Sequence, residues 1–141
     1  MNRHPARDWR AALPAVAGGV IVAVGAVLPW MSLFAGLQTY RGIAGLYGRL
    51  AFAGGALSVI GGVLMLTRPD RRLRLAIGGL GVALTLFAVW VLLGLRATTR
   101  HLDQHPFLLP RPEPGLFIVI AGALVVAALL LPSRRRIENV E

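Results

Sequence analysis

The chain has 141 residues, of which 56% are hydrophobic and 15% are charged, and its mean hydropathy is +0.68. This apolar content exceeds that of ordinary soluble domains, so we expect one membrane domain, residues 1–141. The net charge of +9 comes from 15 basic residues, all Arg, which flank apolar runs in short clusters and therefore argue against a nucleic-acid surface. The lack of Cys excludes disulfides and thiolate chemistry.

Four apolar runs divide the chain. They are residues 11–34, 50–67, 75–95 and 115–131. Each is near or above the ~17 residues that a helix needs to cross a bilayer, and none shows the alternation of a membrane β-barrel. We therefore expect an all-α integral membrane four-helix bundle with outer loops at 35–49 and 96–114.

The first run is longer than the ~7–15 apolar residues of a signal peptide, so we expect it to be a retained span. It ends in Leu28-Pro29-Trp30. Proline cannot continue a helix, and tryptophan is enriched at membrane interfaces. We expect Pro29 to end the helix, Trp30 to anchor the outer interface, and the segment up to Arg49 to cap the bundle.

The arginines predict the orientation of the chain. Three precede the first run, four lie at 68–74 and three follow the last run, whereas two lie at 35–49 and three at 96–114. Because Arg-rich short loops mark the cytoplasmic side, we expect both termini to be cytoplasmic and the protein to lie in the plasma membrane. Seven arginines are expected at anionic lipid head groups: Arg68, Arg71, Arg72, Arg74, Arg134, Arg135 and Arg136.

Small residues recur at four-residue spacing in the runs, which lets helix backbones approach closely in lipid. Six of them are expected at helix contacts: Gly19, Gly54, Ser58, Gly62, Gly79 and Ala83. The three on the second run predict the most crowded contact. The mid-span hydroxyls of Ser58 and Thr85 either bond the carbonyl four residues earlier or a neighbouring helix, or bind the polar group of a lipid or quinone.

All six acidic residues and all three histidines lie outside the four runs. Proton-coupled carriers and haem held between spans need ionisable or ligating groups at membrane depth, so we expect neither, and we predict no cofactor and no catalytic residue. One outer cluster has metal-ligand chemistry. In an extended segment His101, Asp103 and His105 share one side and suit a Zn²⁺ or Cu²⁺ ion, although an ordinary polar loop explains the same residues.

The outer face is the predicted recognition surface. Four prolines between positions 106 and 114 stiffen the second outer loop. The apolar residues 107–109 among them either enter the outer leaflet or dock a partner protein. The residues that we expect to take part in recognition are Trp30, Tyr40, Tyr47, Arg49 and Phe107.

Three short motifs carry a resemblance to a known group. They are Gly25-Ala26-Val27-Leu28-Pro29-Trp30, Leu46-Tyr47-Gly48-Arg49-Leu50 and Pro114-Gly115-Leu116-Phe117. With them the chain resembles small, uncharacterised four-span membrane proteins of actinobacteria, which implies membership and membrane location but no activity. In that group an acidic residue often takes the place of Tyr47. The pattern of Trp30, Gly45-Leu46-Tyr47 and Arg49 is also similar to the first outer loop of claudin-type tetraspan proteins, without their cysteine pair, which implies a short hairpin after the first span.

These features predict a non-enzymatic integral membrane protein that serves as an accessory, assembly or stabilising subunit of a larger membrane complex, or that forms a homo-oligomer. Two alternatives remain open. One is a small oligomeric channel or carrier for an uncharged or lipidic substrate, and the other is a metal-binding outer loop. The expected partners are a bilayer with anionic lipids and other membrane subunits or further copies of the chain, with no nucleic acid.

Overall fold

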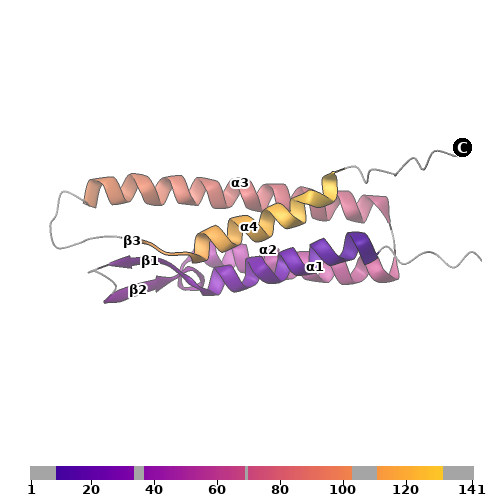
Figure 1. Cartoon of the computed structure of the whole chain (residues 1–141), viewed down its shortest axis with the longest axis horizontal. Helices are drawn as coiled ribbons and strands as arrows, with labels where there is room; N and C mark the ends of the chain where they lie inside the picture. The colour runs from indigo at the N-terminus through magenta and orange to yellow at the C-terminus, as the bar shows by residue number, and fades with distance from the viewer. Residues whose placement is uncertain (1–8, 34–36, 69, 103–110, 132–141) are drawn as a thin grey trace, which may run out of the picture.

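Four α-helices make up most of the structure (Figure 1). The computed structural model describes residues 9–33, 37–68, 70–102 and 111–131. The α-helices are α1 (Trp9–Val27), α2 (Leu46–Thr67), α3 (Arg71–Leu102) and α4 (Gly115–Ala127). The shorter elements are the 3-10 helices η2 (Gly42–Ala44) and η3 (Ala128–Leu130) and the strands β1 (Pro29–Leu33), β2 (Gln38–Arg41) and β3 (Arg111–Pro112). The prediction of a mainly helical fold with four helices is confirmed.

The helices lie side by side as an elongated bundle with two different ends (Figure 1). α1 packs between α2 and α4, and α3 packs on α4 and, less extensively, on α2. The start of α1, the turn between α2 and α3 and the end of α4 lie together at one end, which we call the arginine end. The three strands lie at the opposite end, which we call the sheet end.

The first predicted span is shorter than expected. α1 ends at Val27 and not at residue 34, because Pro29 has no N–H to donate to the preceding turn. The apolar residues that follow form β1 instead. The apolar run therefore continues past the helix into a strand, which a hydropathy pattern does not distinguish.

The second and third helices are longer than predicted. α2 begins at Leu46 rather than at residue 50, and α3 covers Arg71–Leu102 rather than 75–95. Arg, Ala and Leu are good helix formers whatever their hydropathy, so a helix continues where an apolar run stops. The second outer loop consequently loses residues 96–102 to α3.

β1 is the central strand of a three-stranded antiparallel sheet with the order β2-β1-β3. The β1–β2 pair forms a hairpin that starts at Pro29, inside the predicted first span. Its register shifts between Pro29 and Met31, so Trp30 is an extra residue of the kind found in a β-bulge. β3 pairs with Met31 and Ser32 and so brings residues 111 and 112, from the segment predicted as the second outer loop, beside β1.

Adjacent glycines give α1 a close contact on two sides. A Cβ built on Gly18 would lie 2.7 Å from the Gly122 carbonyl oxygen of α4. A Cβ built on Gly19 would lie 2.7 Å from the Gly55 carbonyl oxygen of α2. Successive helical residues point about 100° apart, so one glycine pair serves two neighbouring helices.

α2 carries two such pairs. Gly54 and Gly61 face side chains of α3, whereas Gly55 and Gly62 face α1. The predicted row of Gly54, Ser58 and Gly62 is buried along this helix. The spacing of four residues therefore follows the covered side of α2, and Gly55 and Gly61, which lie outside the row, add contacts that the spacing alone does not describe.

The two small residues of α3 that were predicted at a helix contact do not lie at one within the chain. Gly79 and Ala83 are exposed, and a Cβ built on Gly79 would meet no atom of the described residues within 4 Å. α3 instead packs on η3 through Gly78, where a Cβ would lie 2.7 Å from the Leu130 side chain, and on α4 through Gly81, where a Cβ would lie 2.5 Å from the backbone nitrogen of Ala127. The four-residue spacing identifies one face of a helix, but this face points away from the rest of the chain.

The two mid-span hydroxyls bond within their own helices. Ser58 Oγ donates to the Gly54 carbonyl oxygen at 2.9 Å, and Thr85 Oγ1 donates to the Gly81 carbonyl oxygen at 2.8 Å. Both acceptors lie four residues earlier, which is the first of the two interpretations of the sequence. The hydroxyl protons are therefore already used inside α2 and α3.

Gly55→Ala should destabilise the bundle, because its methyl group would lie 2.8 Å from the Gly19 carbonyl oxygen. Overpacking of this kind costs ~1–3 kcal/mol, and a backbone atom cannot rotate away. Gly79→Ala is the matched control, since it adds the same methyl group in open space. Thermal unfolding in detergent should show a lowered midpoint for Gly55→Ala alone. Equal midpoints for the two variants would contradict the close packing of α1 on α2.

Candidate functional site

One buried tryptophan organises the sheet end. Trp30 is 8% exposed, and its indole Nε1–H donates a 3.0 Å hydrogen bond to the Gly25 carbonyl oxygen of α1. A Cβ on Gly42 would overlap the indole ring, and a Cβ on Gly115 would lie 2.9 Å from its Cδ1 atom. Gly42 of η2 and Gly115 of α4 thus border a slot, which we call the tryptophan slot, that any larger residue at either position would narrow, and the Gly25 carbonyl oxygen of α1 accepts the indole N–H inside it.

The burial of Trp30 in the tryptophan slot contradicts the prediction that this residue anchors the outer membrane interface. The bulge in β1 turns the indole toward the helices, and the Trp30 carbonyl oxygen accepts the Glu113 N–H at 3.1 Å. Trp30 therefore ties the sheet to α1 and to the chain entering α4. It is a buried structural residue and does not belong to an outer recognition surface.

Tyr47 of α2 belongs to a cluster of three aromatic rings, which we call the aromatic cluster, with Phe87 and Trp90 of α3. Its ring centroid lies 5.9 Å from that of Phe87 and 5.8 Å from that of Trp90, with interplanar angles of 65° and 90°. Edge-to-face contacts of this kind contribute ~0.5–1.5 kcal/mol beyond burial. Tyr47 and Trp90 remain 47% and 61% exposed, so the aromatic cluster fastens α2 to α3 and also presents a surface.

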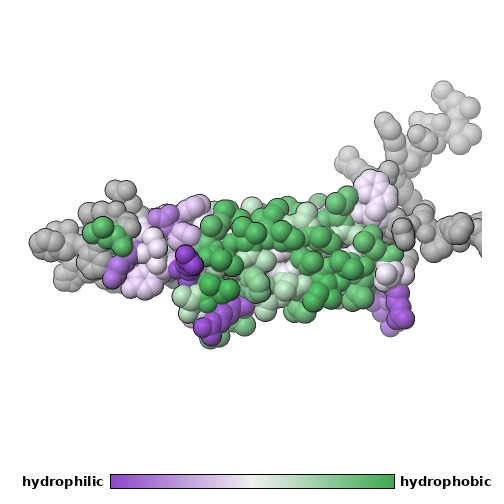
Figure 2. All heavy atoms as spheres, turned by 90° about the horizontal axis from the view of Figure 1, so that it is seen from below, coloured by the Kyte–Doolittle hydropathy of each residue, from purple (hydrophilic) through white to green (hydrophobic). Residues whose placement is uncertain are grey.

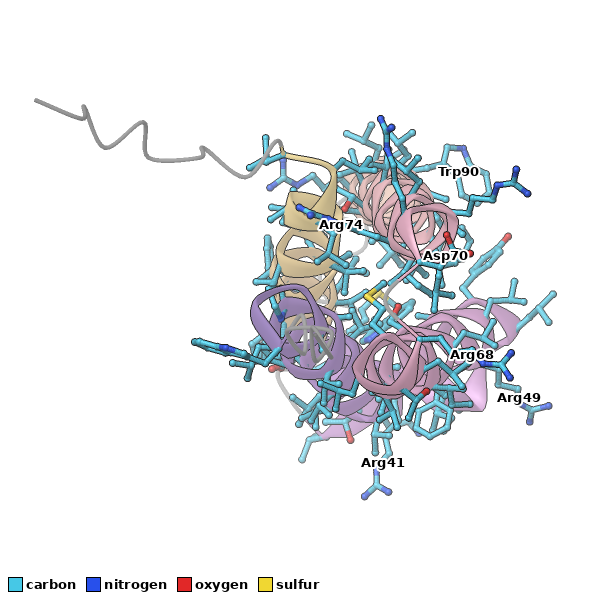
Figure 3. All side chains as sticks on the ribbon, turned by 90° about the vertical axis from the view of Figure 1, so that its right-hand side faces the viewer. Arg41, Arg49, Arg68, Asp70, Arg74 and Trp90 are labelled. Carbon is cyan, nitrogen blue, oxygen red and sulfur yellow. The ribbon has the colours of Figure 1, made fainter. Side chains whose placement is uncertain are left out.

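The other predicted recognition residues are spread over the sheet end. Tyr40 lies on β2, whose four residues are all exposed. Arg49 Nε donates to the Ile43 carbonyl oxygen at 3.3 Å, which braces η2 against the first turn of α2. Arg41 and Arg49 both point away from the bundle (Figure 3). Phe107 lies outside the described residues.

A small apolar cavity lies between the sheet, α3 and α4. Its volume is about 30 Å³, and its walls include Trp30, Leu116 and Phe117, with Arg96 and Glu113 also contributing. A space of this size accommodates water-sized molecules only. In this conformation the cavity therefore offers no room for an organic substrate.

At the arginine end, Arg74 serves a neighbouring helix. Its Nε donates to the Leu129 carbonyl oxygen at 3.0 Å and its Nη2 to the Leu131 carbonyl oxygen at 3.3 Å. These carbonyls end the α4–η3 segment, where helical donors are missing and the helix dipole is negative. Arg74 lies over α4 (Figure 3) and caps that helix, which differs from the predicted role at lipid head groups.

The remaining described arginines of the turn between α2 and α3 are exposed: Arg68, Arg71 and Arg72. Asp70 lies among them, and its Oδ1 accepts the Arg72 N–H at 3.0 Å as the N-cap of α3. The carboxylate is thus held at the helix start while the three guanidinium groups face outward. Three further arginines of the predicted set lie outside the described residues: Arg134, Arg135 and Arg136.

The metal hypothesis stays a prediction. His101 lies in the last turn of α3 and not in an extended segment, so the assumed geometry does not hold at the first ligand. Asp103 and His105 lie outside the described residues. In the part of the chain that the structure describes, no group of three His, Asp or Glu side chains is placed to hold a metal ion.

Sequence reasoning missed the roles of Arg74 and Phe87. The Leu129 carbonyl oxygen that Arg74 caps lies 55 residues later in the chain, and no local sequence pattern predicts a contact at that separation. Phe87 precedes Trp90 by three residues, which places both rings on one side of α3. That spacing is the signal from which the aromatic cluster could have been inferred.

Comparisons with models of protein families, with curated proteins and with solved structures each find no match to this chain. The function is therefore argued from the geometry of the chain itself.

Trp30→Ala should destabilise the protein strongly, because it empties the tryptophan slot and leaves the Gly25 carbonyl oxygen without its donor. Removing a buried Trp side chain costs ~3–5 kcal/mol. Trp90→Ala is the control, since the same side chain is mostly exposed there. Chemical unfolding in detergent should show the larger loss for Trp30→Ala. A similar loss in both variants would rule out the slot as the anchor of the sheet end.

Proposed function

We propose that the chain is an integral membrane protein whose four helices all cross the bilayer, and that it works as a non-catalytic subunit of a membrane assembly. The exposure of its apolar helices carries the proposal. α2 and the Arg71–Ala97 part of α3 are long and apolar enough to cross a membrane, yet only 39% and 33% of their most apolar stretches are buried. An apolar helix in the core of a soluble protein would be covered on most sides.

The apolar surface forms a belt between more polar ends (Figure 2). All four helices contribute large exposed apolar side chains to it, among them Val20, Leu57, Leu86 and Leu124. Such a surface is unfavourable in water in proportion to its area, whereas lipid chains solvate it without penalty. The belt therefore supports a location in the bilayer.

α1 and α4 are the shorter members of the proposed four spans. Their apolar segments are Ala12–Val27 and Gly115–Leu130. At 1.5 Å per residue each extends ~24 Å, somewhat less than the ~30 Å hydrocarbon core. Local thinning of the bilayer accommodates such a difference at modest cost, and both segments lie against the longer helices.

We place the arginine end at the cytoplasmic face. Its exposed guanidinium groups are those of Arg68, Arg71 and Arg72, and cytoplasmic loops carry an excess of such residues. Each gains ~1 kcal/mol near an anionic membrane surface. The start of α1 and the end of α4 lie at the same end (Figure 1), which supports two cytoplasmic termini.

Single thiols test this orientation, because the chain has no Cys of its own. Thr39→Cys on β2 should react with a membrane-impermeant maleimide on intact cells, and Arg72→Cys only after permeabilisation. Both positions are exposed, so access is decided by the membrane. Labelling of Arg72→Cys on intact cells would refute the orientation. Release of the protein by a carbonate wash would refute the four spans.

The outward side of α3 supports a role in assembly. Gly78 packs on Leu130 of η3, and Gly79, about 100° further around the helix, is exposed, as is Ala83 one turn beyond. Small residues are favoured where helices associate within lipid. A channel lining has no comparable support, since the hydroxyls of Ser58 and Thr85 donate within their own helices.

Extraction of the tagged protein in mild detergent should yield a particle larger than one chain with its micelle, containing further copies or other membrane proteins that mass spectrometry identifies. Ala83→Leu should reduce this association, because it adds a bulky side chain on the outward side of α3. Ala53→Leu, an exposed position on α2, is the control. A lone monomer from the unmodified protein would contradict the role as a subunit.

A further inference from the structure

We propose that Tyr47 and Trp90 of the aromatic cluster form one wall of a binding groove for a membrane phospholipid, in which the upper part of one acyl chain lies between Tyr47 and α3. The groove has a volume of about 380 Å³ and is lined by Tyr47, Trp90, Val91, Leu93, Gly94 and Leu95. Small-molecule sites commonly measure ~300–1,000 Å³. The inference rests on the proposed membrane location and adds a ligand to it.

The groove lies where the apolar belt meets the sheet end. α2 begins at Leu46, whereas α3 continues to Leu102, so α3 projects past the start of α2 and leaves a step beside Tyr47. Trp90 points outward from α3 (Figure 3). Tyr and Trp prefer the head-group level of a bilayer, which puts the groove beside the glycerol and upper acyl carbons of the outer leaflet.

The chemistry of the lining suits a lipid chain with its ester. Val91, Leu93 and Leu95 provide apolar walls, and the Tyr47 hydroxyl and Trp90 indole are donors for which ester carbonyls are acceptors. Among the described residues, no atom would lie within 4 Å of a Cβ built on Gly94, so a chain can approach this side of α3 there. The ring contacts hold Tyr47 and Trp90 in place before binding, which reduces the entropy cost of binding.

The dimensions favour a single hydrocarbon chain over a protein helix. The α3 part of the lining, from Trp90 to Leu95, rises only ~7.5 Å along the helix axis. A partner helix is ~10–12 Å across with its side chains and packs along more than one turn. A lipid chain is much thinner and needs no such length.

Trp90 itself reports occupancy. The purified protein in dodecyl maltoside is titrated with phosphatidylcholine whose acyl chains are brominated, because bromine quenches indole fluorescence on contact. The Trp90 signal is the difference from Trp90→Phe, and its quenching should saturate. Gly94→Leu fills the groove and should weaken the apparent affinity about tenfold, or ~1.4 kcal/mol. Ala53→Leu places a leucine at an exposed position of α2 outside the groove lining and should leave the affinity unchanged.

Two outcomes would contradict the proposed binding of a phospholipid in the groove. One is quenching of Trp90 that rises in proportion to the lipid without saturating, and the other is an equal affinity of Gly94→Leu and Ala53→Leu for the lipid. Either result leaves the membrane location untouched, since carbonate extraction and thiol labelling test that location separately. Loss of the protein from washed membranes would instead remove the basis of both proposals.

Discussion

The close approach of helix backbones at glycine is the constraint on which this bundle depends. The contacts are reciprocal: a Cβ on Gly122 would lie 2.8 Å from the Gly18 carbonyl oxygen, and a Cβ on Gly55 would lie 2.8 Å from that of Gly19. A side chain on either partner would push two helices apart. At the proposed location in lipid, apolar side chains would gain nothing by leaving their surroundings, so dispersion contacts from close packing would hold the helices together.

The glycine pairs also explain why the helices adopt this arrangement. Neighbours in a four-helix ring lie about a right angle apart as seen from any one helix, and adjacent residues point ~100° apart. In α1, Gly18 and Gly19 therefore match α4 and α2, and in α2, Gly54 and Gly55 match α3 and α1. Glycine has a related role at the sheet end. There the lack of side chains at Gly42 and Gly115 leaves space for the indole of Trp30 instead of another helix backbone.

The number and type of the main elements follow from the apolar runs, and Ser58 and Thr85 bond as their local spacing indicates. The predictions that were wrong, on the end of the first helix and on the contacts of Gly79 and Ala83, come from what a local sequence pattern leaves out. A run of hydropathy does not separate a helix from the strand that begins at Pro29, and a four-residue spacing identifies a face without naming its partner. Trp30 and Arg74 take their roles from contacts that residue type does not reveal. A tryptophan suggests the membrane interface, but Trp30 is buried and anchors the sheet to α1. An arginine suggests a lipid head group, but Arg74 caps the end of the α4–η3 segment.

The same packing determines which helix is left to meet other molecules. α1 is held between α2 and α4, so its glycine faces are already occupied. α3 packs mainly on α4, makes fewer contacts with α2 and extends past the start of α2. It therefore carries both the glycine without an internal partner, Gly79, and the open groove at Gly94. One helix thus carries both surfaces of the two proposals, the outward side toward the arginine end and the groove proposed for a lipid toward the sheet end. Because they lie about four turns apart at ~3.6 residues per turn, a subunit bound at one need not displace a lipid bound at the other.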